Sequence, residues 1–311
     1  MIAPIARTAL ALAVVPLAVA PAAAQPVFRS GVDLVHLGVT VVDRQGTPIT
    51  SLTAADFEVH EEGRRQEVQY FLRGDDHTDR RGPVRVGMLL DTSGSMSDDL
   101  RFAATAAIKF LKTLDWAEDI TLVDFDTEVR VARFPPADFP RLVERIRSRK
   151  PDGWTALYDA LGVYLDGATS EDGEKILVLY TDGGDTRSAM TFNEARDLLR
   201  SADIVLYAVG LLEHQPQSVR QEQRLRLMQL AEATGGRAFF PLSKEQLDAA
   251  YEQVRLEMAA RYTIGYAPNA PRTDGSWREV TVRLTRPELR QAKVRTRRGY
   301  FAPLKAGPPT P

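Results

Sequence analysis

One stretch near residue 90 constrains the fold of this chain more than any other. Residues 84–90 are almost continuously apolar, the run stops at Asp91, and a short loop rich in hydroxyl groups follows. Apolar residues then recur at helical spacing from Leu100 to Leu114. A strand that ends at an acidic residue and leads through a polar loop into a helix is typical of the binding edge of an open α/β sheet. We therefore expect such a sheet, with a site at the carboxyl end of this strand.

The same alternation of strand and helix patterns continues through the centre of the chain. Further apolar runs of strand length occur at residues 176–180 and 204–209. Strands that read as continuous apolar runs are typical of a parallel sheet covered on both faces. Residues 128–134 follow the strand pattern at 120–125 too closely for a crossover helix, so we expect them to be antiparallel at a sheet edge. Residues 83–259 are therefore expected to form a doubly wound, mainly parallel, Rossmann-like α/β domain.

Two segments with strand patterns flank this central piece, an N-terminal β segment at 26–82 and a C-terminal β segment at 260–302. Each has too few strands to be stable alone. Their charges are opposite, because residues 27–82 hold seven arginines and ten acidic residues, whereas residues 261–301 hold ten basic and three acidic residues. We hypothesise that the two segments pair into one β-sandwich-like domain, and that the α/β domain is an insertion in it.

The two ends of the chain are expected to lie outside the fold. Residues 1–24 have a basic start at Arg7, an apolar stretch and a small-residue cleavage pattern, which predicts a secretory signal peptide. The alternative is an uncleaved membrane anchor, although the apolar stretch is shorter than the roughly 20 residues that a spanning helix needs. We expect a periplasmic or extracellular protein, with no transmembrane segment after cleavage. Residues 303–311 are rich in proline and predict a disordered tail.

Composition excludes several kinds of chemistry. The chain has no cysteine, so disulfides, thiolate metal sites and cysteine nucleophiles are ruled out. Its four histidines are scattered without ligand spacing, which argues against a zinc site. The formal net charge of −2 gives no general attraction to nucleic acid, and we expect no such partner.

Three polar loops are expected at the binding edge of the sheet. The first carries Asp91, Ser93 and Ser95, the second carries Thr155 at a helix start, and the third carries Asp182 after the strand at 176–180. Oxygen ligands of this kind suit a hard cation such as Mg²⁺, Mn²⁺ or Ca²⁺. The plainer alternative is that these side chains only end strands, fill turns and cap helices.

At these residues the chain resembles the von Willebrand factor type A (VWA) domain family. The signature of that family's metal-ion-dependent adhesion site is D-x-S-x-S, followed by a separate threonine and a separate aspartate. Here Asp91, Ser93 and Ser95 match the first element, Thr155 the second and Asp182 the third. The resemblance covers residues 83–259. It implies that the two serines and the threonine coordinate the cation directly, and that the two aspartates often act through water.

The mature chain as a whole is similar to a bacterial group of secreted VWA-related proteins, which carry β segments before and after the A domain. The residues that carry this similarity are 39–43, 56–59, 262–266 and 298–303. The group implies no particular biochemical activity.

Three further residues lie near the predicted loops in the sequence. Asp126 and Asp185 lie near strand ends and are candidate outer-shell groups, with solvated loop carboxylates as the alternative. Trp154 precedes Thr155 and is a candidate contact for a partner, or else a packed side chain.

The sequence thus predicts a binding module that captures a protein or peptide partner with an acidic side chain through a divalent cation. No catalytic residues and no enzymatic activity are expected. One alternative is a metal-dependent, phosphatase-like hydrolase, but the chain lacks a D-x-D-x-T motif and a histidine beside the cluster. The other is a structural envelope protein in which the metal only stabilises loops.

Overall fold

The computed structural model describes residues 34–74, 83–114, 117–169 and 171–304. The predicted signal peptide and residues 305–311 of the predicted tail lie outside these ranges. Of the helices in the described ranges, none is long and apolar enough to cross a membrane.

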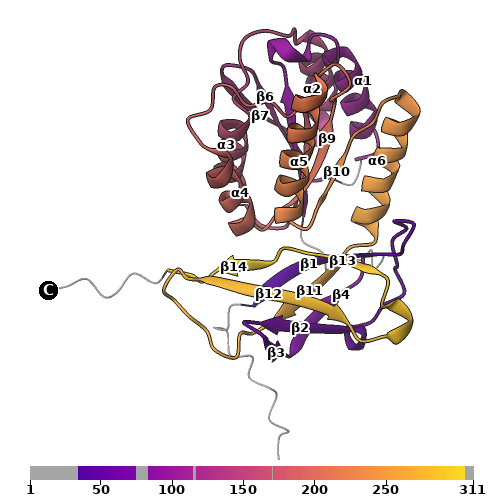
Figure 1. Ribbon diagram of the computed structural model, residues 1–311, viewed down its shortest axis with the longest axis vertical. Helices are drawn as coiled ribbons and strands as arrows, with labels where there is room; N and C mark the ends of the chain where they lie inside the picture. Colours follow the sequence, from indigo (N-terminus) through magenta and orange to yellow (C-terminus); the bar gives the residue numbers. More distant parts are fainter. Residues whose placement is uncertain (1–33, 75–82, 115–116, 170, 305–311) are drawn as a thin grey trace, which may run out of the picture. The chain divides into compact units, whose positions relative to one another are not determined.

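The centre of the chain forms a six-stranded sheet with the order β10-β9-β8-β5-β6-β7 (Figure 1). Its strands are β5 (Val84–Asp91), β6 (Asp119–Phe125), β7 (Val129–Phe134), β8 (Glu174–Thr181), β9 (Val205–Gly210) and β10 (Arg237–Phe239). Neighbouring strands are parallel except at one edge, where β7 is antiparallel to β6. This arrangement confirms the predicted doubly wound, mainly parallel sheet and its antiparallel edge strand.

Helices cover both faces of this sheet. The helices of one layer are α1 (Leu100–Leu111), α2 (Phe139–Ser148) and α6 (Lys244–Ala259), and those of the other are α3 (Leu157–Thr169), α4 (Phe192–Ser201) and α5 (Gln217–Ala233). Side chains alternate between the two faces along a strand, so Met88 and Leu90 join the core of the first layer whereas Leu89 joins the core of the second. The continuous apolar pattern of β5 follows from this double burial.

The flanking segments form two antiparallel four-stranded sheets, with the orders β13-β1-β11-β4 and β14-β12-β2-β3. Their strands are β1 (Val35–Val42), β2 (Phe57–Glu61), β3 (Arg64–Gln66), β4 (Val68–Leu72), β11 (Tyr262–Tyr266), β12 (Trp277–Leu284), β13 (Lys293–Arg295) and β14 (Gly299–Phe301). Four short 3-10 helices, η1 (Ala54–Asp56), η2 (Gly94–Met96), η3 (Pro136–Asp138) and η4 (Pro287–Leu289), lie in connections of the chain.

Both of these sheets contain N-terminal and C-terminal strands, which alternate in the first sheet and meet at the β12–β2 pair in the second. β1 lies between β11 and β13, β4 pairs with β11, and β2 pairs with β12; Figure 1 shows indigo strands beside yellow ones. Side chains from both sheets, among them Val39, Val59, Ile264 and Val282, share one apolar core. The predicted β-sandwich-like domain built from both ends of the chain is therefore confirmed, and the α/β domain interrupts it between β4 and β11.

Candidate metal centre

Two acidic residues lie together at the carboxyl edge of the central sheet. Asp91 is the last residue of β5, and Asp182 follows the last residue of β8. The two strands are parallel neighbours, so their carboxyl ends lie at the same edge. Both side chains are buried, with exposed fractions of 0% for Asp91 and 2% for Asp182. A buried carboxylate needs hydrogen bonds and a compensating charge.

Hydrogen bonds fix the orientation of Asp91 and of the loop that follows it. The hydroxyl of Thr181 donates to Asp91 Oδ2 at 2.6 Å, and the backbone N–H of Ser93 donates to Asp91 Oδ1 at 2.9 Å. The hydroxyl oxygens of Ser93 and Ser95 are 3.1 Å apart. Ser93 is buried and Ser95 is exposed, so this hydroxyl pair reaches from the buried carboxylate towards solvent.

The loop that carries Thr155 is tied to the first loop by its backbone. The N–H of Gly94 donates to the carbonyl of Gly153 at 3.1 Å, and the N–H of Asp152 donates to the carbonyl of Thr92 at 3.0 Å. Thr155 is buried, and within the described part of the chain its hydroxyl forms no hydrogen bond. That oxygen is therefore available to a ligand.

The third loop is tied to the second in the same way. The carbonyl of Thr155 accepts the N–H groups of Thr186 and Arg187 at 2.9 and 3.0 Å. Asp182 accepts the N–H of Gly184 at 3.1 Å and the side-chain amide of Gln215 at 2.7 Å. The fold thus gathers the three predicted loops, and with them all five predicted site residues, at one edge of the sheet.

The electrostatics of the two aspartates are unfavourable as they stand. Burial raises the pKa of Asp91, the negative charge of Asp182 raises it further, and the pKa reaches about 7 despite the hydrogen bonds from Ser93 and Thr181. A shift of this kind means that the protein alone does not neutralise the pair.

Other buried acidic residues in the described ranges show how this chain normally compensates such a charge. Eight acidic side chains are buried there, and six of them form an ion pair with an arginine or a histidine. The six are Asp56 with Arg286, Glu61 with Arg278, Asp99 with His214, Asp119 with Arg85 and Arg133, Asp124 with Arg130, Arg145 and Arg149, and Glu257 with Arg237 and Arg295. The two without such a partner among the described residues are Asp91 and Asp182.

The donor set fits a hard divalent cation. It consists of two carboxylates and three neutral hydroxyls, and oxygen ligands of this type suit Mg²⁺, Mn²⁺ and Ca²⁺. In the described ranges no group of three or more His, Cys, Asp or Glu side chains is arranged to hold a metal. Any metal at this edge therefore depends on the hydroxyls of Ser93, Ser95 and Thr155 as well as on the two carboxylates.

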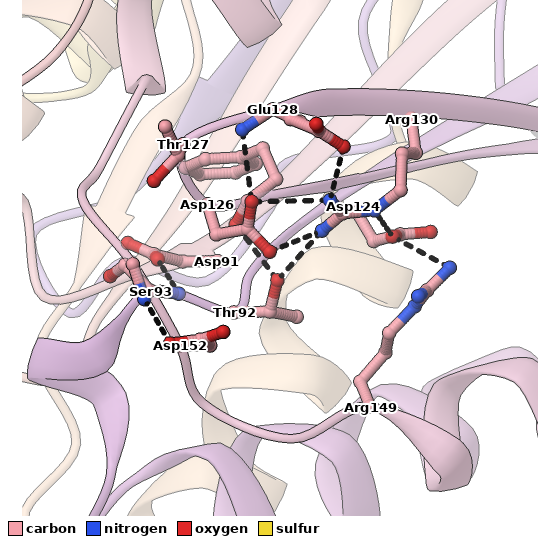
Figure 2. A network of polar contacts seen from close by, with 12 residues as sticks. Asp91, Thr92, Ser93, Asp124, Asp126, Thr127, Glu128, Arg130, Arg149 and Asp152 are labelled. Carbon is pink, nitrogen blue, oxygen red and sulfur yellow. Dashed lines mark hydrogen bonds and ion pairs between the residues drawn. The ribbon is translucent and has the colours of Figure 1, made fainter.

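A second buried carboxylate site lies directly beside the first, and the sequence did not reveal it. Asp124 of β6 is 0% exposed and pairs with Arg130, Arg145 and Arg149 at 2.7–2.9 Å. Figure 2 shows Asp124 with Arg130 and Arg149. Arg130 also lies 3.4 Å from the hydroxyl of Thr92, which precedes Ser93. Through Arg130 the cluster contacts the first loop on the side away from Asp182.

The structure gives the three additional residues distinct roles. Asp126 pairs with Arg130, and although burial alone would raise its pKa, the hydrogen bonds from Arg130 and the backbone lower it. Asp185 accepts the N–H of Tyr158 at 3.1 Å and the hydroxyl of Ser188 at 2.6 Å, so it anchors the third loop to α3. Trp154 is 65% exposed next to Thr155.

The loop after β9 carries two residues that the sequence did not assign to this edge, Gln215 and His214. His214 precedes Gln215, whose amide donates to Asp182, and His214 itself lies 3.1 Å from Asp99. The hydrogen bond and charge of Asp99 raise the pKa of His214, which favours its protonated form. A protonated imidazole is poorly suited to act as a general base. Neither Gln215 nor His214 could be placed here from spacing, because both lie in a loop distant in sequence.

The family assignment rests on a match over more than half of the chain. The sequence profile of the von Willebrand factor type A domain matches residues 86–253. The chain therefore belongs to the von Willebrand factor type A domain family. No curated protein matches it significantly.

Several solved structures of low sequence identity align with this chain. The VWF domain of the type V pili tip protein Mfa5 from Porphyromonas gingivalis is 13% identical, with 58% of this chain and 97% of that chain covered and a TM-score of 0.47. A conserved hypothetical protein, BatB from Bacteroides thetaiotaomicron, is 15% identical, with 57% and 99% covered and a TM-score of 0.45. A von Willebrand factor type A protein from Catenulispora acidiphila is 12% identical, with 88% and 76% covered and a TM-score of 0.47.

Proposed function

We propose that this protein is a binding module that captures a protein partner through a divalent cation held by Asp91, Ser93, Ser95, Thr155 and Asp182. VWA domains generally bind protein partners. The observation that carries the cation is that Asp91 and Asp182, alone among the buried acidic side chains of the described ranges, lack a cationic partner. A bound cation would supply the missing charge, and Mg²⁺ is our first choice, with Mn²⁺ and Ca²⁺ as alternatives.

The chemistry of the ligand set favours an acidic side chain on the partner. The hydroxyls of Ser93, Ser95 and Thr155 add no charge and the two aspartates would act through water, so the ion is left under-neutralised and a coordination position facing solvent suits a glutamate or aspartate. Ser95 lies on the exposed side of the site, and the exposed ring of Trp154 lies beside Thr155. An exposed tryptophan at the edge of a binding site is typical of interface residues that contribute strongly to affinity.

We further propose that the protein works in the periplasm or outside the cell. The support for this location is the signal-peptide pattern of residues 1–24. A site that holds Mg²⁺ or Ca²⁺ and thereby binds a carboxylate of the partner is compatible with either compartment.

The experiment uses a fluorescein-labelled peptide that alternates glutamate with leucine, and measures its binding to the purified protein by fluorescence anisotropy. We expect binding in MgCl₂ that weakens in EDTA, and the same loss in a Ser93→Ala variant. Ser201→Ala is the matched control, because the hydroxyl of Ser201 only donates to the carbonyl of Leu198 on α4. A peptide with glutamine in place of glutamate should not bind.

Two outcomes separate this proposal from the alternatives. If Ser93→Ala lowers the melting temperature in MgCl₂ but leaves peptide binding unchanged, the metal is structural. If the peptide binds equally well in EDTA, the cation-dependent mechanism is wrong. Turnover of a phosphoester that disappears in Asp91→Ala would instead support the hydrolase.

A further inference from the structure

A groove lies between α1 and α2 and begins beside the candidate metal centre. Its volume is about 600 Å³. At one end it is lined by Ser97 and Pro151. The N–H of Ser97 donates to the carbonyl of Gly94, between the two site serines, and Pro151 lies four residues before Thr155. A ligand held at the metal centre is therefore next to the entrance of this α1–α2 groove.

The charge of the groove is entirely positive. Its lining includes six basic side chains and no acidic one, and the six are Arg101, Lys109, Lys112, Arg147, Arg149 and Lys150. Two of them are paired with acids of the protein, Lys109 with Asp248 at 2.5 Å and Arg149 with Asp124 at 2.9 Å. The other four form no ion pair with a residue of the described ranges, and all four are exposed.

Arg149 lines the groove and also pairs with Asp124, the buried carboxylate beside the candidate metal centre. It shares the carboxylate of Asp124 with Arg130 and Arg145, and Arg130 in turn pairs with Asp126. Figure 2 shows Arg149 and Arg130 on either side of Asp124. In addition, the Nε atom of Arg149 is buried and has no hydrogen-bond acceptor. The positive charge of the groove that no acidic residue of the described ranges balances therefore belongs to Arg101, Lys112, Arg147 and Lys150.

The floor of the groove is apolar. It is formed by Leu100, Ala104 and Ile108 of α1 and by Ile146 of α2, of which Leu100, Ile108 and Ile146 are 4%, 7% and 1% exposed and Ala104 is partly exposed. A flexible polyanion such as polyphosphate would contact the basic rim but gain nothing from the narrow apolar surface of this floor. A polypeptide that alternates acidic and apolar side chains would satisfy both.

We propose that the α1–α2 groove binds an acidic segment of the protein partner, continuous with the side chain that binds at the metal centre. This inference rests on the proposed function in one respect, because the carboxylate that would bind the metal marks one end of the segment in the groove. Its own evidence is the charge of the rim, the apolar floor and the position of the groove. The partner is thereby defined as a protein with a run of acidic and apolar residues rather than a single exposed carboxylate.

The test uses the alternating glutamate–leucine peptide with a triple variant, Lys112→Gln with Arg147→Gln and Lys150→Gln. The matched control is Lys244→Gln with Arg283→Gln and Arg290→Gln, which removes the same charge from exposed positions elsewhere. We expect the groove variant to weaken peptide binding about tenfold, from roughly 0.5 kcal/mol for each exposed charge pair, and the control to leave it unchanged. Melting temperatures establish that both variants fold.

Measurements in MgCl₂ and in EDTA distinguish failure of this inference from failure of the proposed function. If the groove variant weakens peptide binding by the same factor in MgCl₂ and in EDTA, the result supports binding of the peptide in the groove even if the cation has no effect. Binding that responds to EDTA but is equal in the groove variant and its control overturns the groove. Polyphosphate that displaces the peptide, combined with equal binding of a glutamate–serine peptide, also overturns it, because the apolar floor would then have no role.

Discussion

Asp124 and Asp91 lie on neighbouring strands of one sheet, are both fully buried, and are compensated in opposite ways. Asp124 of β6 pairs in register with Leu90 of β5, the residue before Asp91. Three arginines bind Asp124, whereas Asp91 faces a second aspartate. One carboxylate site is thus compensated by cationic side chains of the protein, whereas under the proposed function the other would be compensated by a bound cation.

The two carboxylates should contribute differently to the free energy of unfolding. A buried charge without a partner is costly, and removal of one member of a buried ion pair leaves the other uncompensated. Neutralising the carboxylate should therefore have opposite effects on the free energy of unfolding at the two sites.

The largest effect is expected at the compensated site. Asp124→Asn removes the only acidic partner that Arg145 and Arg149 have among the described residues, while Arg130 keeps Asp126, and it should lower the free energy of unfolding by about 3 kcal/mol. The value is at the lower end for buried pairs because the arginine side chains are each 27% exposed. Urea denaturation measures it. The control is Glu128→Gln, an 80% exposed partner of Arg130, which should change the free energy of unfolding by less than about 0.5 kcal/mol.

A smaller effect of opposite sign is expected at the uncompensated site. In EDTA, Asp182→Asn removes the repulsion on Asp91 and should raise the free energy of unfolding by about 1 kcal/mol. The hydrogen bond with Gln215 survives if that amide turns over. Saturating MgCl₂ should then stabilise the wild type but not the variant, because only the wild type binds the ion. Destabilisation in EDTA comparable with that of Asp124→Asn would remove the contrast between the sites.

The smallest effect concerns a compensated carboxylate in the β domain and its dependence on pH. The hydrogen bond from Arg286 holds the pKa of Asp56 below its ordinary value of 3.8. Because the folded-state pKa is lowered, the stabilisation is fully present above about pH 4 and is lost as the pH falls through the folded-state pKa.

Arg286→Gln should therefore lower stability at neutral pH and make the remaining stability less sensitive to acid below pH 4. Urea denaturation across this pH range measures the effect. The control is Arg283→Gln on β12, the strand that precedes Arg286 in the chain. Equal acid sensitivity of the wild type and the Arg286 variant would show that Asp56 does not depend on this pair.

Much of the fold could be predicted because its signals are local. The apolar runs of β5, β8 and β9 indicate a sheet covered on both faces, and the short connection before β7 indicates an antiparallel edge. The three-residue strand β10 was missed, since so short a segment has no period that distinguishes it from a loop.

The candidate site was predictable only in part, because only some of its residues belong to a local motif. Asp91, Ser93 and Ser95 form a local motif, whereas Arg145 and Arg149 approach Asp124 from α2 and the loop that follows it. Gln215 and His214 likewise come from a loop after β9. Contacts between side chains this distant in sequence depend on the packing of helices against the sheet, which no periodicity encodes.

The central claim is that Asp91 and Asp182 help to bind a divalent cation. Calorimetric titration of the purified protein with MgCl₂ and MnCl₂ tests it most directly. The account predicts saturable binding of one ion by the wild type, no binding by Asp91→Asn, and wild-type binding by Asp126→Asn, whose carboxylate is paired with Arg130. Absence of binding by the wild type, or equal binding by wild type and Asp91→Asn, would contradict it.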